Sequence, residues 1–215
     1  MKNKIFIISA ACLLSVGLTS CESKITQDEA IALLNSYEPL KEFKDLHSIV
    51  YTVSTTTNGE STPNQIVHID FKNLYYYSFE DKPLPQVPLE ILIFKEDSQY
   101  TMCSSHGGGY VSITAPEARN YISAEKTYLD YLASFNANTI LNFHYDGEIT
   151  YAKKGNALMI HGTLITETIE SKYLLELNDR GLITKEEINA TSPTTTETFL
   201  RKAEYNVAIS KKTRL

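Results

Sequence analysis

Most of this chain alternates apolar and polar residues with a period of two, which is the pattern of β-strands that bury one face. Ile49, Tyr51 and Val53 alternate with polar neighbours, and Asn58-Gly59 supplies a two-residue hairpin turn before the next alternating run. Asp179-Arg180-Gly181 separates two later strands in the same way, because glycine tolerates the positive φ of a tight turn. The pattern predicts one mostly antiparallel sheet of roughly eight to ten strands, which is too large to stay flat.

Two segments depart from this alternation and have helical spacing. Thr26 and Glu29 have the spacing of a capping box, so a helix is predicted to begin there and to end near Pro39. A second helix is predicted over residues 114–138, with Pro116 at an early position where its missing N–H is not needed. The predicted fold class is therefore α+β: a large curved antiparallel sheet, or incomplete barrel, with an N-terminal helix and an inserted helical segment.

The first twenty residues have the composition of a secretory leader. Lys2 and Lys4 precede an apolar run over residues 5–18, and a run of this length is shorter than the roughly twenty residues of a bilayer crossing. The phrase Leu18-Thr19-Ser20-Cys21 resembles the lipobox of bacterial lipoproteins, in which an aliphatic residue and two small residues precede the cysteine whose sulfur is lipidated. An ordinary cleavable signal with a cysteine near its end is the alternative.

The lipobox resemblance implies a domain organisation and a location. Residues 1–20 are expected to be a lipoprotein signal peptide, residues 21–25 a short tether, and residues 26–215 a single domain. Cys21 is the expected lipidation site, where fatty acyl chains such as palmitate anchor the protein. The protein is then expected on the extracytoplasmic side of a membrane in a bacterial cell envelope.

The charge of the chain excludes one class of partner. Without Lys2 and Lys4, 18 basic residues remain against 26 acidic ones, a formal net charge of −8. Nucleic-acid binding relies on clustered lysine and arginine, so nucleic acid is not expected as a partner. The only basic cluster, at Lys211, Lys212 and Arg214, is expected to be a solvated tail.

The order of predicted elements resembles the LolA-like superfamily, which comprises lipoprotein carriers and related envelope lipoproteins, including its LppX-like members. The best local match is the stretch from Tyr173 to Ile188, a strand, an acidic-glycine turn and a strand, followed by a closing strand over residues 196–209. The resemblance implies an incomplete antiparallel barrel whose open side is covered by the helical insertion. It supplies no catalytic or receptor-contact residue to carry over.

Three patterns were considered for catalysis or metal binding, and each favours a structural interpretation. The phrase His106-Gly107-Gly108-Gly109 resembles the oxyanion loop of some esterases, but no Gly-x-Ser-x-Gly elbow accompanies it, so a turn is expected. Ser123 and Lys126 have the spacing of penicillin-interacting serine enzymes without the other elements of that site. The five histidines lack metal-ligand spacing. No catalytic residue, metal or cofactor is therefore predicted.

The remaining feature is the 14 tyrosines, among them Tyr75-Tyr76-Tyr77, whose rings must alternate between the two faces of a strand. The leading hypothesis is a non-enzymatic lipoprotein that binds a lipid or another hydrophobic ligand in the groove of a half-barrel. The alternative is a structural or protein-interaction lipoprotein whose core is filled by its own side chains. The residues expected to point inward are Leu89, Ile91, Ile93, Ile165 and Leu175.

Overall fold

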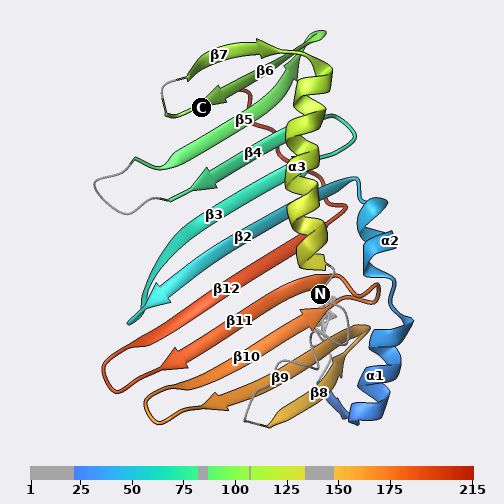
Figure 1. Ribbon diagram of the computed structural model, residues 1–215, viewed down its shortest axis with the longest axis vertical. Helices are drawn as coiled ribbons and strands as arrows, with labels where there is room; N and C mark the ends of the chain where they lie inside the picture. Colours follow the sequence, from blue (N-terminus) through green and yellow to red (C-terminus); the bar gives the residue numbers. More distant parts are fainter. Residues whose placement is uncertain (1–21, 82–86, 107, 134–147) are drawn as a thin grey trace, which may run out of the picture.

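The computed structural model describes residues 22–81, 87–106, 108–133 and 148–215. In these ranges, one antiparallel sheet of twelve strands carries three helices on a single face (Figure 1). The predicted fold class is confirmed, with more strands than the eight to ten expected. The elements, in chain order, are β1 (Ser23–Ile25), α1 (Gln27–Ser36), α2 (Pro39–Lys44), β2 (Ser48–Thr57), β3 (Glu60–Asp70), β4 (Tyr75–Glu80), β5 (Leu89–Glu96), β6 (Gln99–Ser104), β7 (Gly108–Ile113), α3 (Ala115–Ala133), β8 (Ile149–Lys154), β9 (Ala157–Ile165), β10 (Glu170–Leu177), β11 (Ile183–Thr191) and β12 (Thr196–Tyr205).

The sheet consists of two meanders joined in the middle. Its strand order is β1-β8-β9-β10-β11-β12-β2-β3-β4-β5-β6-β7, so the first meander runs from β2 to β7 and the second from β8 to β12. The two halves meet where β12 pairs with β2, for example at Ala203 opposite Tyr51. Strands β1 and β7 form the two edges, and the sheet is not closed into a barrel.

Helix α3 lies on the same face as α1 and α2, and this face is called the helix face below. Strand β7 is at one edge of the sheet and β8 is next to the other, so the chain between them must cross the sheet. In Figure 1, α3 makes the first part of this crossing over β6 to β2. No helix within the described ranges has the length and apolar composition that a membrane crossing requires.

Local sequence signals account for the ends of several elements. The Thr26 hydroxyl accepts a hydrogen bond from the backbone N–H of Glu29, and the Glu29 carboxylate accepts one from the backbone N–H of Thr26, so the predicted capping box is confirmed. Thr114 and Glu117 form the same pair of bonds at the start of α3, which the sequence analysis missed. Asn58 and Gly59, with φ of 52° and 89°, form the predicted hairpin turn between β2 and β3.

Residues 23–25, which were expected to be part of a short tether, form a strand. Ser23–Ile25 form strand β1 and pair with β8, with Ser23 opposite Lys153 and Ile25 opposite Tyr151. The side chain of Ile25 packs with the cluster beneath α1. This pairing is non-local, which explains why three residues with no strong strand pattern are ordered in the sheet.

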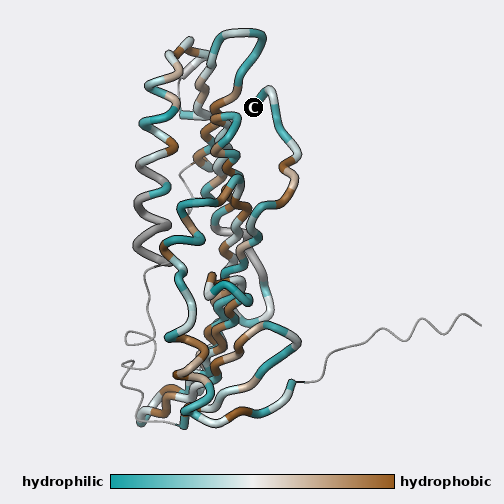
Figure 2. The backbone as a smooth tube through the Cα atoms, turned by 90° about the vertical axis from the view of Figure 1, so that its right-hand side faces the viewer, coloured by the Kyte–Doolittle hydropathy of each residue, from teal (hydrophilic) through white to brown (hydrophobic). Residues whose placement is uncertain are grey.

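The C-terminal end also differs from the expectation. Strand β12 ends at Tyr205 rather than at residue 209, because Asn206 adopts a φ of 55° and turns the chain away from the sheet plane. Residues 206–215, called the C-terminal segment below, then run over the face opposite the helices, called the far face (Figure 2). The side chain of Asn206 accepts a hydrogen bond from the backbone N–H of His47, and the Ser48 hydroxyl donates one to the Val207 carbonyl. The segment is thus fixed to the start of β2.

Candidate functional site

The helix face carries two separate hydrophobic clusters. The α3 cluster lies beneath α2 and α3 and centres on the buried residues Phe43, Ile69, Tyr76 and Ile93. The α1 cluster lies beneath α1, and its buried members are Ala30, Leu34, Tyr151, Leu158, Ile160, Leu175 and Leu177. Each is filled by the side chains of the helix above it and of the strands below it, as expected for a sheet with one face packed against helices.

A charged pair lies on the helix face between these clusters. Arg201 on β12 and Glu186 on β11 are direct cross-strand neighbours, and Arg201 Nη2 lies 2.8 Å from Glu186 Oε2. Only 16% and 21% of their side chains are exposed. Tyr173 donates a longer hydrogen bond of 3.4 Å to the other carboxylate oxygen of Glu186. Removing either residue of this pair would leave the other charge largely buried without a partner, which lowers the free energy of unfolding.

Helix α2 connects the two clusters, and a hollow of about 720 Å³ opens beside it. Tyr37, the C-terminal cap of α1, packs on the α1 cluster, whereas Phe43 belongs to the α3 cluster. Leu40 on α2 is 45% exposed. The described residues that line this α2 hollow are Tyr37, Glu38, Pro39, Leu40, Lys41, Lys44 and Asp45.

The hairpin between β10 and β11 packs against Tyr37, which lines the α2 hollow, and contacts α2. Gly181 has a φ of +78°, and a Cβ at this position would lie 2.5 Å from Tyr37 Cβ. The preceding residue of the hairpin, Arg180, has its Nη1 atom 3.3 Å from Glu42 Oε2 on α2. Only glycine allows both the backbone conformation and the close approach of the hairpin to Tyr37.

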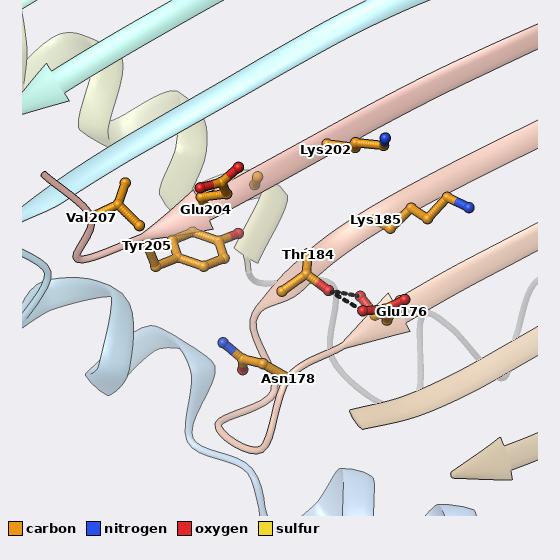
Figure 3. Close-up of a pocket in the computed structure, with 9 residues that line it drawn as sticks. Glu176, Asn178, Thr184, Lys185, Lys202, Glu204, Tyr205 and Val207 are labelled. Carbon is orange, nitrogen blue, oxygen red and sulfur yellow. Dashed lines mark hydrogen bonds between the residues drawn. The ribbon is translucent and has the colours of Figure 1, made fainter. Parts of the chain in front are cut away.

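A second hollow, of about 500 Å³, lies where β10 and β12 end and β11 begins (Figure 3). The Thr184 hydroxyl donates hydrogen bonds to the Glu176 carbonyl and, at 3.2 Å, to its carboxylate. Burial raises the pKa of Tyr205 to about 12, and its hydroxyl donates to the Ile183 carbonyl. The lining of this hollow combines charged and polar side chains with the apolar surface of Ala203, Tyr205 and Val207. It comprises Glu176, Asn178, Thr184, Lys185, Lys202, Ala203, Glu204, Tyr205 and Val207.

The far face has a hydrophobic cluster of its own, which the C-terminal segment covers. Tyr75 and Tyr77 point to this face, whereas Tyr76 points to the helix face and meets Tyr121, so the predicted alternation of the three rings is confirmed. Lys212 Nζ donates to the Tyr77 hydroxyl at 2.8 Å and lies 4.2 Å from the ring centroid. Ile209 packs on the same cluster.

Ionic contacts also fix the C-terminal segment. Lys211 Nζ lies 2.8 Å from Asp70 Oδ2, and Lys212 Nζ lies 3.4 Å from Glu90 Oε1. The expectation of a solvated basic tail is therefore wrong for these two lysines. Burial together with the charge of Lys212 lowers the pKa of His68, which is on the same face. No local sequence pattern predicts this contact, because Lys211 and Lys212 are more than a hundred residues away from their partners.

The residues predicted to line a groove do not all point inward. Ile93 and Leu175 are buried in the α3 and α1 clusters, and Ile91 packs on the former. Leu89 is half-buried on the same face. Ile165 is 65% exposed at the end of β9 and lies on the far face, opposite Glu170, so its prediction is wrong. Ile165 is the last residue of β9, next to the turn at residues 166–169, and no described helix or strand packs over its side chain.

The patterns considered for catalysis have structural roles in the described residues. The Ser105 hydroxyl donates to the Pro88 carbonyl and accepts from the backbone N–H of Glu90, so it ties β5 to β6 beside His106. Lys126 Nζ donates to the Lys44 carbonyl and lies 4.9 Å from the Phe71 ring centroid, so it joins α3 to α2. Among the described residues, no group of three or more histidine, cysteine, aspartate or glutamate side chains is placed to hold a metal ion.

The predicted lipidation site, Cys21, lies outside the described residues, and its neighbour Glu22 is the first of them. Glu22 Oε2 lies 3.6 Å from His161 Nε2 on β9. Cys103 is a buried free cysteine on the far face. Burial raises the pKa of the Cys103 thiol, which disfavours the reactive thiolate.

Comparisons with known proteins add little to this geometry. No protein-family model and no curated protein sequence matches the chain. Among solved structures, the chain is similar to LprF from Mycobacterium bovis, with a TM-score of 0.37 and 14% sequence identity over 87% of this chain and 97% of that chain. A similarity this distant carries no argument about function. The resemblance to the LolA-like superfamily therefore stays a prediction.

Proposed function

We propose that the protein is a non-enzymatic lipoprotein of a bacterial cell envelope, anchored through lipid on Cys21, that binds the apolar part of an amphipathic molecule in the α2 hollow. The anchor is supported by the basic n-region, the apolar run and the lipobox-like phrase that precede Cys21. Strand β1 then begins two residues after Cys21, so the anchor leads directly into the folded domain.

The observation that carries ligand binding is the α2 hollow. Its volume of about 720 Å³ lies within the ~300–1,000 Å³ range of small-molecule sites. Tyr37, Pro39 and Leu40 supply apolar lining. The rest of the lining carries charges of both signs, with Lys41 Nζ 2.8 Å from Glu38 Oε2 and Lys44 near Asp45 in the same helix end. An acyl chain with a zwitterionic head has apolar surface and charges of both signs, so this lining fits an amphipathic lipid better than a purely polar metabolite.

Native mass spectrometry of the soluble protein beginning at Glu22 tests ligand binding. We expect a co-purified hydrophobic molecule on the wild-type chain, and we expect Leu40→Glu to lose it because a charge would stand among the apolar lining. Val111→Glu is the matched control, since Val111 is also an exposed aliphatic residue (55%) but lies on β7, at the opposite edge of the sheet from α1. A ligand-free wild-type mass, or equal occupancy in the Leu40 variant, would contradict the proposal.

A second candidate function rests on a different observation. Ile93 and Leu175, both predicted to line a groove, are instead buried among the protein's own side chains. A filled core is what the alternative of a structural or protein-interaction lipoprotein requires. The same native mass measurement separates the two candidates, because only a ligand-binding protein carries added mass that Leu40→Glu removes.

A further inference from the structure

The N-terminal residues are fixed to one edge of the sheet. Strand β1 pairs with β8 over its whole length, and the Ser23 hydroxyl lies 3.4 Å from the Lys153 carbonyl. The preceding residue, Glu22, reaches over β8 to contact His161 on β9. Strand pairing therefore holds the chain in place from Ser23, two residues after Cys21.

This attachment limits where a lipid on Cys21 can be. Consecutive Cα atoms are about 3.8 Å apart, so the Cys21 Cα lies within about 8 Å of the Ser23 Cα. A tether of this length cannot carry the anchor away from the β1–β8 edge. Acyl chains inserted in a bilayer would consequently bring this edge to the level of the lipid headgroups.

The charge of this edge is complementary to an anionic headgroup surface. Strands β1 and β8 carry three lysines, Lys24, Lys153 and Lys154, and no acidic residue, although Glu22 and Glu148 flank them and the chain after the predicted leader has a net charge of −8. Lys24 is opposite Ala152 and so faces the far side, whereas Lys153, the next residue along β8, faces the helix side. Lysines on both faces of the edge favour contact through the edge itself rather than through either face.

We propose that the β1–β8 edge is a membrane-contacting surface that meets anionic lipid headgroups, and that the sheet stands on this edge. The inference rests on the proposed lipidation of Cys21. Strand β7 is the other edge, eleven strand spacings away, which corresponds to roughly 50 Å at about 4.8 Å per spacing. The long axis of the molecule in Figure 1 therefore points away from the bilayer.

Energy transfer from single fluorophores to a headgroup-labelled lipid tests this orientation. The mature lipidated protein, which begins at Cys21, is placed in vesicles containing phosphatidylglycerol, with a label on Asn156→Cys in the β8–β9 turn or on Tyr110→Cys in β7. Cys103→Ala in both chains removes the buried thiol. We expect strong transfer at position 156 and at least several-fold weaker transfer at position 110. Equal transfer at the two positions would overturn the orientation.

Two further measurements separate the parts of the inference. The mass of the N-terminal peptide from the same sample reports lipidation: a peptide without lipid would overturn both the anchor and the orientation, whereas a lipidated protein with equal transfer overturns the orientation alone. Replacing Lys24 and Lys154 by glutamate should reduce transfer at position 156 in anionic vesicles, while the exposed Lys72→Glu should not. Unchanged transfer in the double variant would overturn the role of anionic headgroups.

Discussion

Substitution of Gly181 by alanine tests the link between the β10–β11 hairpin and the α2 hollow. Two costs add at this position. A non-glycine residue at a φ of +78° is strained by about 1–2 kcal/mol. The new Cβ would also lie 2.5, 2.7 and 2.9 Å from three atoms of Tyr37, and overpacking of this kind typically costs about 1–3 kcal/mol. We therefore expect Gly181→Ala to lower the free energy of unfolding by about 2–5 kcal/mol.

Gly59 provides a matched control in the same chain. Its φ of +89° imposes a similar backbone strain, but a Cβ there meets nothing within 4 Å. Gly59→Ala should therefore cost only about 1–2 kcal/mol. Because the two variants share the strain, the difference between them measures the contact with Tyr37.

The assay is urea unfolding of the soluble protein followed by circular dichroism. A double-mutant cycle with Tyr37→Gly, which removes all three crowded atoms, should reduce the cost of Gly181→Ala to that of Gly59→Ala. Equal costs for the two alanine variants in the wild-type background would refute the argument that the hairpin packs tightly on Tyr37. The Gly181 variant should also lose any ligand of the α2 hollow, since Tyr37 lines it.

Three other perturbations test the charged contacts on both faces. Lys212→Met should lower the free energy of unfolding by about 1 kcal/mol, since its half-exposed ammonium loses Tyr77 and Glu90; no change in urea unfolding would contradict the docking of the C-terminal segment. Burial and the charge of Lys212 lower the pKa of His68 in the folded protein, so the imidazole binds a proton more readily in the unfolded chain. The free energy of unfolding should therefore be highest above pH ~6.5 and should fall as the pH decreases below this value. Urea midpoints between pH ~5 and ~7.5 measure this fall, which should be smaller in Lys212→Met and absent in His68→Gln. Arg201→Met should cost about 2 kcal/mol because Glu186 loses its partner, and adding Glu186→Leu should restore most of the loss; an undiminished loss in the double variant would show that the cost is not that of an unpaired carboxylate.

Signals contained in a few neighbouring residues predicted much of the fold. The Thr26–Glu29 capping box, the Asn58-Gly59 turn and the alternation of Tyr75 to Tyr77 all have the predicted conformation. Each depends on backbone geometry or on side-chain bonds within a short stretch of chain, so the sequence is enough to predict it.

The features that the sequence did not predict depend on residues far apart in the chain. Strand β1 exists because β8, more than a hundred residues later, offers it an unpaired edge. The docking of Lys211 and Lys212 depends on Asp70, Tyr77 and Glu90 in the other half of the sheet. The α2 hollow likewise had no sequence signal, because its shape depends on how the β10–β11 hairpin approaches α1. Ile165 was misplaced because period-two alternation assigns a face only when the register of the neighbouring strands is known.

The most direct test of the account is the mass of the N-terminal peptide of the protein extracted from membranes of a bacterium that expresses the full sequence. The account predicts that the peptide begins at Cys21 and carries diacylglycerol on its sulfur, and that Cys21→Ser releases the protein from the membrane fraction. A peptide that begins elsewhere, or one that begins at Cys21 without lipid, would contradict the proposed anchor.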